Sequence, residues 1–214
     1  MKKIVLLGDS IRMGYDKYVK EALAGSAEVL YPKENCKFAL NILRCIVEWK
    51  RDGVWGDDVD LVHWNAGLWD CVEVSGDVPL TPLAWYEETV ARVDKRLRDF
   101  FPKAKIVFAT STSVAEARYT PDFCRHNAII EEYNAAALRA LAPTDTVIND
   151  LYALTKTFPD TYRSDATHFY TSEGTEIIGG RVLSLITELL GICASEVKLE
   201  SFIPEKYSAK NIGN

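Results

Sequence analysis

The chain has 214 residues, of which 48% are hydrophobic and 26% are charged, values that fit one globular domain with a sizeable core. The formal net charge of -6 argues against a nucleic-acid-binding protein, for which a basic face is typical, and no run of Lys and Arg stands out. No segment approaches the ~20 apolar residues of a membrane span, so we expect neither a nucleic-acid nor a membrane partner.

Short apolar runs alternate with longer amphipathic segments along the chain. Five apolar runs predict buried strands, at 3–7, 27–31, 59–64, 105–109 and 146–148. Apolar residues at three- and four-residue steps predict helices, at 12–24, 38–51, 82–101, 127–141 and 173–194. For the third of these helices, Thr81 is the expected N-cap and Pro82 the expected first helical residue.

The alternation of strands and helices predicts the fold class. Parallel strands need crossover connections, so the sheet should be mostly parallel and covered on both faces. We therefore predict an α/β protein, a three-layer α/β/α sandwich of about five parallel strands. Residues 1–196 should form a single domain, and 197–214 a polar tail. Ligands of such sheets bind beyond the carboxyl ends of the strands, so functional residues should lie there.

The segment Gly8-Asp9-Ser10 directly follows the first predicted strand. A serine at a strand-to-helix turn has its hydroxyl at the carboxyl edge of the sheet and its N–H near a helix N-terminus. Both positions suit a nucleophile whose attack creates an oxyanion. The same tripeptide is common in ordinary turns and N-caps, so this motif alone does not establish catalysis.

A nucleophilic serine needs a base, and the chain has only three histidines. His63 lies inside a predicted strand, which favours a packed structural role, and His126 lies in a polar loop, where we expect it to be exposed. His168 precedes the last helix and has Asp165 three residues before it. A tight turn at that spacing can place the carboxylate on Nδ1 and fix the tautomer. We predict Ser10, His168 and Asp165 as nucleophile, base and orienting acid.

The two motifs together resemble a known family. Gly8-Asp9-Ser10 and Asp165-Ala166-Thr167-His168 are similar to the first and last motif blocks of the SGNH/GDSL hydrolases, over nearly the whole domain. The resemblance implies a flavodoxin-like sandwich and ester hydrolysis through an acyl-enzyme, without a cofactor or a metal. The runs 65–70 (NAGLWD) and 149–152 (NDLY) look like a branch of presumed carbohydrate esterases. The expected partner is therefore a small-molecule substrate, a short-chain (acetyl) ester of a carbohydrate or another small polar molecule.

The oxyanion hole departs from the family pattern. The middle block of the family is Gly-x-Asn-Asp, and alignment on Gly67 and Asp70 places Trp69 where the asparagine belongs. Trp69 offers only an indole N–H. Asn65, at the end of the third strand, is the candidate replacement; its structural alternative is a strand-ending turn residue.

The second block of the family supplies a glycine N–H, but the segment 32–38 contains no glycine. We expect the side chain of Asn35 or the backbone N–H of Cys36 to donate there, beside the N–H of Ser10. Losing one donor typically costs about 10²–10³ in kcat, so an imperfect hole predicts a slow enzyme.

Four residues in loops near the expected site are predicted to bind substrate: Asp9, Arg12, Trp69 and Arg118. Arginine pairs with carboxylates or phosphates, and tryptophan stacks on sugars or acyl chains. Arg125 is expected in the same loops, and Arg12, Trp69, Arg118 and Arg125 are each also of a kind common at a surface or rim.

The five cysteines form no CxxC pair, so neither a zinc ribbon nor a redox motif is indicated. We expect reduced, mostly buried thiols, Cys36 included. The apolar run 4–7 is too short for a signal peptide, so we expect a cytoplasmic protein unless a leader has been removed from its precursor.

Two alternatives stay open. The first is a catalytically impaired small-molecule or carbohydrate-binding module on the same fold. The second is an FMN-binding protein, which needs a phosphate-cradling loop after the first strand, and 8–14 (GDSIRMG) offers only a thin version of one. The sequence does not indicate an oligomeric state.

Overall fold

The computed structural model describes residues 1–53 and 55–198, and every structural statement below refers to these ranges. Five parallel strands form one sheet in the order β2-β1-β3-β5-β7. Their bounds are β1 (Lys2–Leu7), β2 (Ala27–Leu30), β3 (Leu61–Trp64), β5 (Lys105–Ala109) and β7 (Val147–Asn149). The predicted five-stranded parallel sheet is confirmed.

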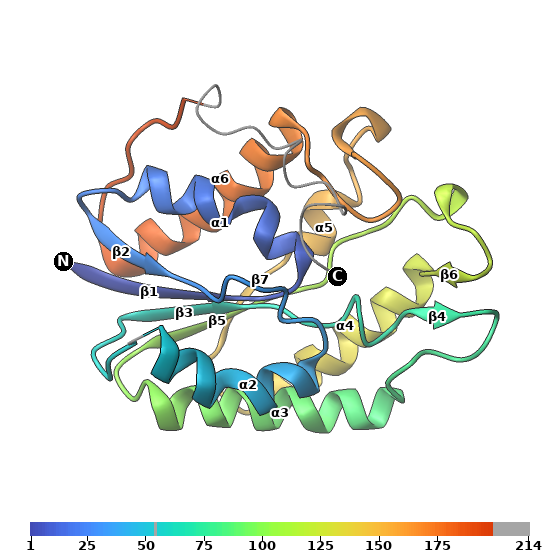
Figure 1. The fold of residues 1–214 in the computed structure, drawn as a ribbon, viewed down its shortest axis with the longest axis horizontal. Coiled ribbons are helices and arrows are strands. Elements are labelled where there is room, and N and C mark those ends of the chain that lie inside the picture. The colour runs from blue at the N-terminus through green and yellow to red at the C-terminus, as the bar shows by residue number, and fades with distance from the viewer. Residues whose placement is uncertain (54, 199–214) are drawn as a thin grey trace.

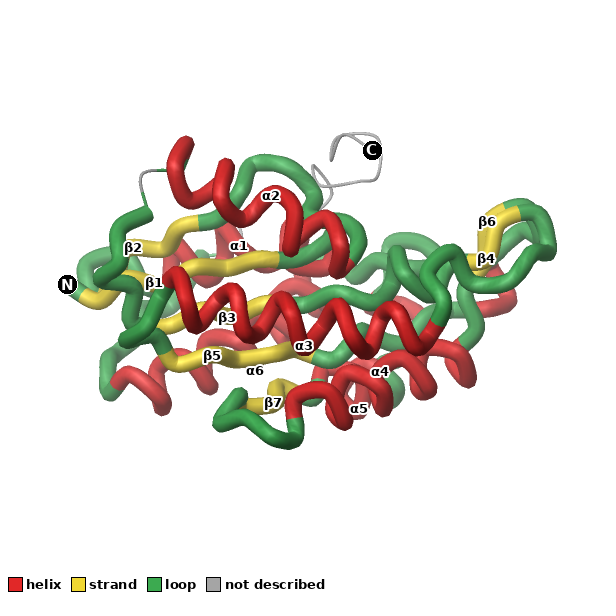
Figure 2. The backbone as a smooth tube through the Cα atoms, turned by 90° about the horizontal axis from the view of Figure 1, so that it is seen from below, coloured by secondary structure: helices red, strands yellow, loops and turns green. Residues whose placement is uncertain are grey.

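Helices cover both faces of this sheet (Figure 1). Helices α1 (Ser10–Ala22) and α6 (Ser172–Leu190) contact each other on one face. On the other face, α3 (Leu83–Phe100) lies between α2 (Ala39–Asp52) and α4 (Asn127–Leu141), as Figure 2 shows. The predicted three-layer α/β/α sandwich is therefore confirmed.

The strands are buried on both faces, as continuous apolar runs in parallel sheets usually are. Ile4 to Leu7 in β1 are 0% exposed. His63 in β3 is also fully buried, with Nδ1 3.4 Å from the Tyr15 hydroxyl and Nε2 3.2 Å from the Asn149 amide. Burial lowers the pKa of His63 to about 3, so this histidine is a neutral structural residue, as predicted.

The structure corrects some element boundaries and adds elements. Helix α1 starts at Ser10, and the expected Thr81 cap is wrong because Pro82 occupies the N-cap position without a side-chain cap. The added elements are β4 (Glu73–Val74), β6 (Phe123–Cys124), α5 (Leu151–Thr155) and two single 3₁₀ turns, Glu116–Arg118 and Asp160–Tyr162. Strands β4 and β6 pair antiparallel in a ribbon that extends away from the main sheet (Figure 1).

The strand order fixes where a ligand can bind. From β1 the chain crosses first to β2 on one side and then to β3 on the other, which makes a topological switch point between β1 and β3. Ligands of open parallel sheets bind in the crevice at the carboxyl ends of such a strand pair. Ser10 lies three residues after the end of β1, and Asn65 directly follows β3, so the predicted nucleophile lies at this crevice.

Two further expectations concern the C-terminal tail and membrane-spanning segments. Of the predicted tail 197–214, residues 199–214 lie outside the described residues. Among the helices that the structure describes, none is long and apolar enough to cross a membrane.

Candidate active site

The structure brings Ser10, His168 and Asp165 into one line of hydrogen bonds. Nε2 of His168 lies 2.7 Å from Oγ of Ser10. Nδ1 of His168 lies 2.8 Å from Oδ2 and 3.0 Å from Oδ1 of Asp165. A serine, a base within hydrogen-bond reach and a third group that orients the base are the arrangement that nucleophilic catalysis requires.

The nucleophile position is built by the turn between β1 and α1. Asp9 is the N-cap of α1, and its Oδ1 accepts a hydrogen bond of 2.9 Å from the N–H of Ile11. Ser10 is the first residue of the helix, so its N–H is one of the terminal donors that have no acceptor within the helix. The positive end of the helix dipole also lies here. An anion that forms on a substrate bound to Ser10 would therefore meet a favourable field.

The acid of the triad is held by its own turn. Oδ1 of Asp165 accepts 2.7 Å hydrogen bonds from the N–H groups of Thr167 and His168. Partial burial alone would raise the pKa of Asp165, but the His168 ring and these N–H groups outweigh it and lower the pKa to about 2. The carboxylate is thus ionised at neutral pH and can fix the proton of His168 on Nδ1.

Sequence reasoning missed Tyr170. Its ring stacks on His168, with ring centroids 4.7 Å apart and an angle of 18° between the planes. Its hydroxyl donates a 2.6 Å hydrogen bond to the backbone carbonyl of Ser10. The ring also packs on Gly14 of α1, where a Cβ would approach Cε1 to 2.7 Å. Tyr170 therefore links the base to the nucleophile. The only sequence signal for this role is its position two residues after His168.

The expected backbone donor in the oxyanion hole is not available. The N–H of Cys36 donates a 3.0 Å hydrogen bond to the carbonyl of Gly8, so the prediction that it serves the hole is wrong in this structure. Burial raises the pKa of Cys36 to about 11, which agrees with the predicted structural thiol. The hydrogen bond from Cys36 to Gly8 holds the 35–36 segment against the nucleophile turn.

Two asparagine side chains lie next to that turn. Asn65 is 3% exposed and lies beside the carboxylate of Asp9. Its Oδ1 lies so close to Gly8 that a Cβ at Gly8 would overlap it. Asn35 is also 3% exposed; its Oδ1 accepts a hydrogen bond from Lys37, and its Nδ2 has no partner among the described residues. Both remain candidate oxyanion donors.

A cleft of about 560 Å³ opens onto the nucleophile and the base. Such a volume is ordinary for a small-molecule site. Trp69 and Phe123 form an aromatic wall, with ring centroids 6.5 Å apart, and Leu68 lies beside them. Trp69 thus lies where a substrate contact was predicted.

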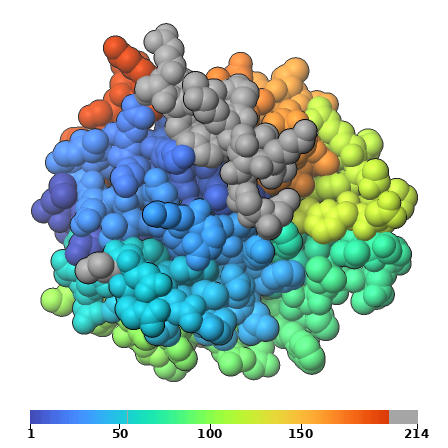
Figure 3. Space-filling model, viewed as in Figure 1, coloured from blue at the N-terminus to red at the C-terminus, as the bar shows by residue number. Residues whose placement is uncertain are grey.

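Arg118 lines the same cleft. Its guanidinium forms an ion pair with Asp160 and donates a 3.3 Å hydrogen bond to the carbonyl of Asp165. Figure 3 shows the chain around residues 115–125 at the surface beside the chain around 160–165, which this contact joins. Arg118 therefore supports the loop that carries the triad acid and stays a candidate substrate contact.

Two predicted substrate contacts need correction. Asp9 and Arg12 are both 0% exposed. Arg12 forms a buried ion pair with Asp16 and donates a 2.7 Å hydrogen bond to the carbonyl of Glu34. Oδ1 of Asp9 accepts the hydrogen bond from Ile11, and its Oδ2 is buried without a hydrogen-bond partner among the described residues. Neither side chain reaches the cleft, so both support the nucleophile turn from within.

His126 and the cysteines, the other side chains that could act as bases, nucleophiles or metal ligands, do not line the cleft at Ser10. His126 is exposed, as predicted. All five cysteines are free, but the expectation that most are buried is wrong. Cys36 and Cys71 are buried, whereas Cys193 is exposed and the other two are intermediate.

Comparison with known proteins identifies the fold. No family model and no curated protein matches the chain. Among solved structures, a lipase/acylhydrolase from Enterococcus faecalis has 21% identity and a TM-score of 0.67, over 92% of this chain and 100% of its own. A GDSL-like lipase from Bacteroides thetaiotaomicron has 16% identity and a TM-score of 0.65, over 87% of this chain and 88% of its own.

A carbohydrate esterase family 3 protein from Talaromyces cellulolyticus is similar as well, with 18% identity and a TM-score of 0.64, over 89% of this chain and 99% of its own. At these identities the likeness concerns the fold. The chain has an SGNH/GDSL hydrolase-like fold, as its first and last motifs predicted.

Proposed function

We propose that the protein is a serine ester hydrolase that works through an acyl-enzyme on Ser10. One observation carries the proposal, namely the unbroken line of hydrogen bonds from Asp165 through His168 to Ser10, at 2.8 and 2.7 Å. The likeness of the fold to lipases and esterases agrees with it. The proposed compartment is the cytoplasm, which suits five free thiols.

The proposed reaction has two halves. Oγ of Ser10 attacks the ester carbonyl while Nε2 of His168 takes its proton, and the imidazolium is stabilised by Asp165. The tetrahedral intermediate collapses as His168 returns the proton to the leaving alcohol, which yields the acyl-enzyme. Water then attacks with the same base, and the acid is released.

The oxyanion would be held first by the N–H of Ser10 at the start of α1. Asn65 and Asn35 are the candidates for a second donor, because both are buried amides beside the Gly8 turn. Removing a true donor costs about 10²–10³ in kcat. Comparing Asn65→Ala with Asn35→Ala therefore identifies which amide serves, since the other variant should change kcat far less.

For the substrate, we propose a short acyl group, acetyl in the first instance, on a carbohydrate or another small polar alcohol. The support is the cleft itself, which offers an aromatic wall of Trp69 and Phe123 for stacking and the polar Arg118 at its side. Aromatic side chains give sugars a flat apolar surface with a polar edge nearby. The solved relative named as a carbohydrate esterase acts as a precedent for the fold.

The test compares wild type, Ser10→Ala and the control Ser184→Ala, whose residue is exposed on α6, on p-nitrophenyl acetate, butyrate and octanoate. We expect turnover that falls with chain length, survives in the control and is lost in Ser10→Ala. Retained turnover in Ser10→Ala contradicts the proposal.

A fluorophosphonate probe separates the proposal from the alternative of a binding module. A working triad should be labelled at Ser10, and a folded protein that is not labelled there would instead be a binding module with an impaired site. Release of acetate from acetylated sugars then tests the proposed alcohol.

A further inference from the structure

The β4–β6 ribbon carries three side chains of the kinds that bind transition metals. Glu73 lies on β4 directly opposite Cys124 on β6, and His126 follows at the start of α4. Sγ of Cys124 lies 3.7 Å from Nε2 of His126, and this Nε2 lies 3.7 Å from Oε2 of Glu73. One ligand atom from each of the three residues lies within 4.8 Å of the others.

These separations match the edges of a tetrahedral metal site. Zinc binds sulfur at ~2.3 Å and nitrogen or oxygen at ~2.0–2.2 Å, which places neighbouring ligand atoms about 3.4–3.6 Å apart in a tetrahedron. Both 3.7 Å contacts to His126 Nε2 are close to that value. The third separation, between Cys124 Sγ and the Glu73 carboxylate, is no more than 4.8 Å, so it has to shorten by at most about 1 Å when one ion takes all three ligands.

The imidazole is already oriented for this role. Nδ1 of His126 lies 3.1 Å from Oε2 of Glu116. The other oxygen of Glu116 accepts hydrogen bonds of 2.8 and 2.9 Å from the backbone and side chain of Asn127, which hold the carboxylate in place. A carboxylate on Nδ1 leaves the lone pair on Nε2, facing Cys124 and Glu73. Metal-binding histidines usually have such a partner.

We propose that Glu73, Cys124 and His126 bind one divalent transition-metal ion of the zinc class. A thiolate and an imidazole favour zinc over magnesium or calcium, which prefer oxygen ligands. The His126 side chain is 46% exposed and that of Glu73 20%, so water can complete the four ligands. On binding, the Cys124 thiol releases its proton to solvent and its sulfur bonds the metal.

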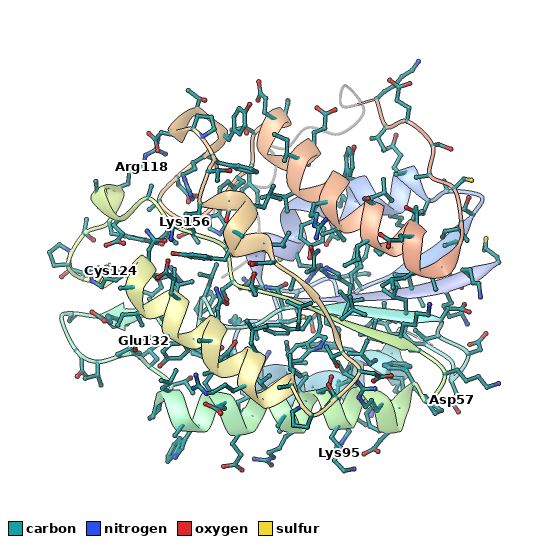
Figure 4. All side chains as sticks on the ribbon, turned by 180° about the vertical axis from the view of Figure 1, so that it is seen from behind. Asp57, Lys95, Arg118, Cys124, Glu132 and Lys156 are labelled. Carbon is teal, nitrogen blue, oxygen red and sulfur yellow. The ribbon has the colours of Figure 1, made fainter. Side chains whose placement is uncertain are left out.

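The site would brace one wall of the cleft. Phe123 and Arg125, the neighbours of Cys124 in sequence, both line the cleft, and Nε of Arg125 donates a hydrogen bond to the carbonyl of Leu68. Figure 4 shows Cys124 at the same end of the molecule as Arg118. A metal that joins β4, β6 and the start of α4 therefore makes this wall more rigid and takes no part in bond cleavage at Ser10.

The experiment titrates the full metal-free chain with Co²⁺ and follows the absorption bands that report cobalt–thiolate bonds and four-coordinate geometry, with Zn²⁺ as competitor. Wild type, Ser10→Ala and the control Cys193→Ser should each bind one equivalent with the same spectrum. Cys124→Ser should lose the charge-transfer band, and Glu116→Gln should bind about 10–100-fold more weakly.

Two results would overturn the metal site: the same Co²⁺ spectrum in Cys124→Ser as in wild type, or a wild-type titration that does not saturate at one equivalent. Circular dichroism of each variant checks that the fold is intact. Because Ser10→Ala should bind the metal normally, failure of the proposed esterase activity and failure of the metal site are separate outcomes.

Discussion

Replacing Asp165 by asparagine should remove most of the proposed esterase activity by changing the tautomer of His168. Oδ1 of Asp165 accepts two backbone hydrogen bonds of 2.7 Å, from Thr167 and His168. In the variant, the amide oxygen has to occupy this place, because only an oxygen can accept both bonds. The amide nitrogen then takes the position of Oδ2, which lies 2.8 Å from Nδ1 of His168.

An NH₂ group at that position donates to Nδ1, so the ring proton moves to Nε2. Nε2 lies 2.7 Å from Oγ of Ser10 and can no longer accept its proton. The expected loss in kcat is about 10³–10⁴; the same change in serine proteases costs about 10⁴. At 1.36 kcal/mol per tenfold, this corresponds to about 4–5.5 kcal/mol of transition-state stabilisation.

The assay measures kcat and KM on p-nitrophenyl acetate for wild type, Asp165→Asn and the control Asp99→Asn, whose carboxylate pairs with Lys95 on the exposed side of α3. KM should change little, because Asp165 does not contact the leaving group in the proposed mechanism. Urea unfolding at neutral pH should show Asp165→Asn folded but somewhat less stable than wild type, because the turn keeps both backbone hydrogen bonds but loses the ionised carboxylate beside His168. A kcat for Asp165→Asn within about tenfold of wild type would refute the tautomer argument.

Three further predictions concern stability and positioning. Gly8→Ala should destabilise the fold by about 1–3 kcal/mol, because the added Cβ would overlap Oδ1 of Asn65. The control Gly180→Ala has open space around the added Cβ and should not lower the stability. Equal urea midpoints for the two variants would contradict the predicted overlap. Tyr170→Phe should cost about 1–2 kcal/mol in urea unfolding, because it removes the 2.6 Å hydrogen bond to the nucleophile's carbonyl, but it should lower kcat by less than about tenfold because the ring stack remains. The pKa of Asp165 is about 2 in the folded chain against ~3.9 when unfolded, so its contribution to stability is complete above about pH 4 and is lost as the pH falls towards 2. Unfolding free energies measured between pH 2 and 6 should therefore fall more steeply for wild type than for Asp165→Asn, and parallel curves would show that this carboxylate is not linked to folding.

The sheet and the triad could be predicted because each depends on short-range signals. Strand β1 is an unbroken apolar run, and such runs are diagnostic when both faces of a sheet are covered. His63 and His168 both have an aspartate three residues before them, Asp60 and Asp165, but of these two only His168 lies outside a predicted strand and just before a predicted helix. Both signals are local: the apolar run lies within one strand, and the tight turn that carries Asp165 and His168 depends on neighbouring residues rather than on distant ones.

The parts that were missed depend on tertiary contacts. Strands β4 and β6 have two residues each, too few to show an alternating pattern. Nothing in the sequence indicates that the N–H of Cys36 has a partner. In the folded chain it donates a hydrogen bond to the carbonyl of Gly8, at the turn after β1. Likewise, nothing local indicates that the ring of Tyr170 stacks on His168 and reaches Ser10.

The burial of Arg12 explains how the nucleophile turn is held in place. Charged side chains are rarely buried, so an arginine after β1 was expected at the rim of the cleft. A buried arginine needs a partner of opposite charge, and the carboxylate of Asp16, four residues later on the same helix face, pairs with Arg12. Nη2 of Arg12 then bonds the carbonyl of Glu34 and approaches that of Gly8 at 3.5 Å. The guanidinium thus ties the segment that carries the candidate donor Asn35 to the turn that carries the nucleophile. The i,i+4 pair was visible in the sequence, and as a buried pair it indicates a support inside the site rather than a contact with substrate.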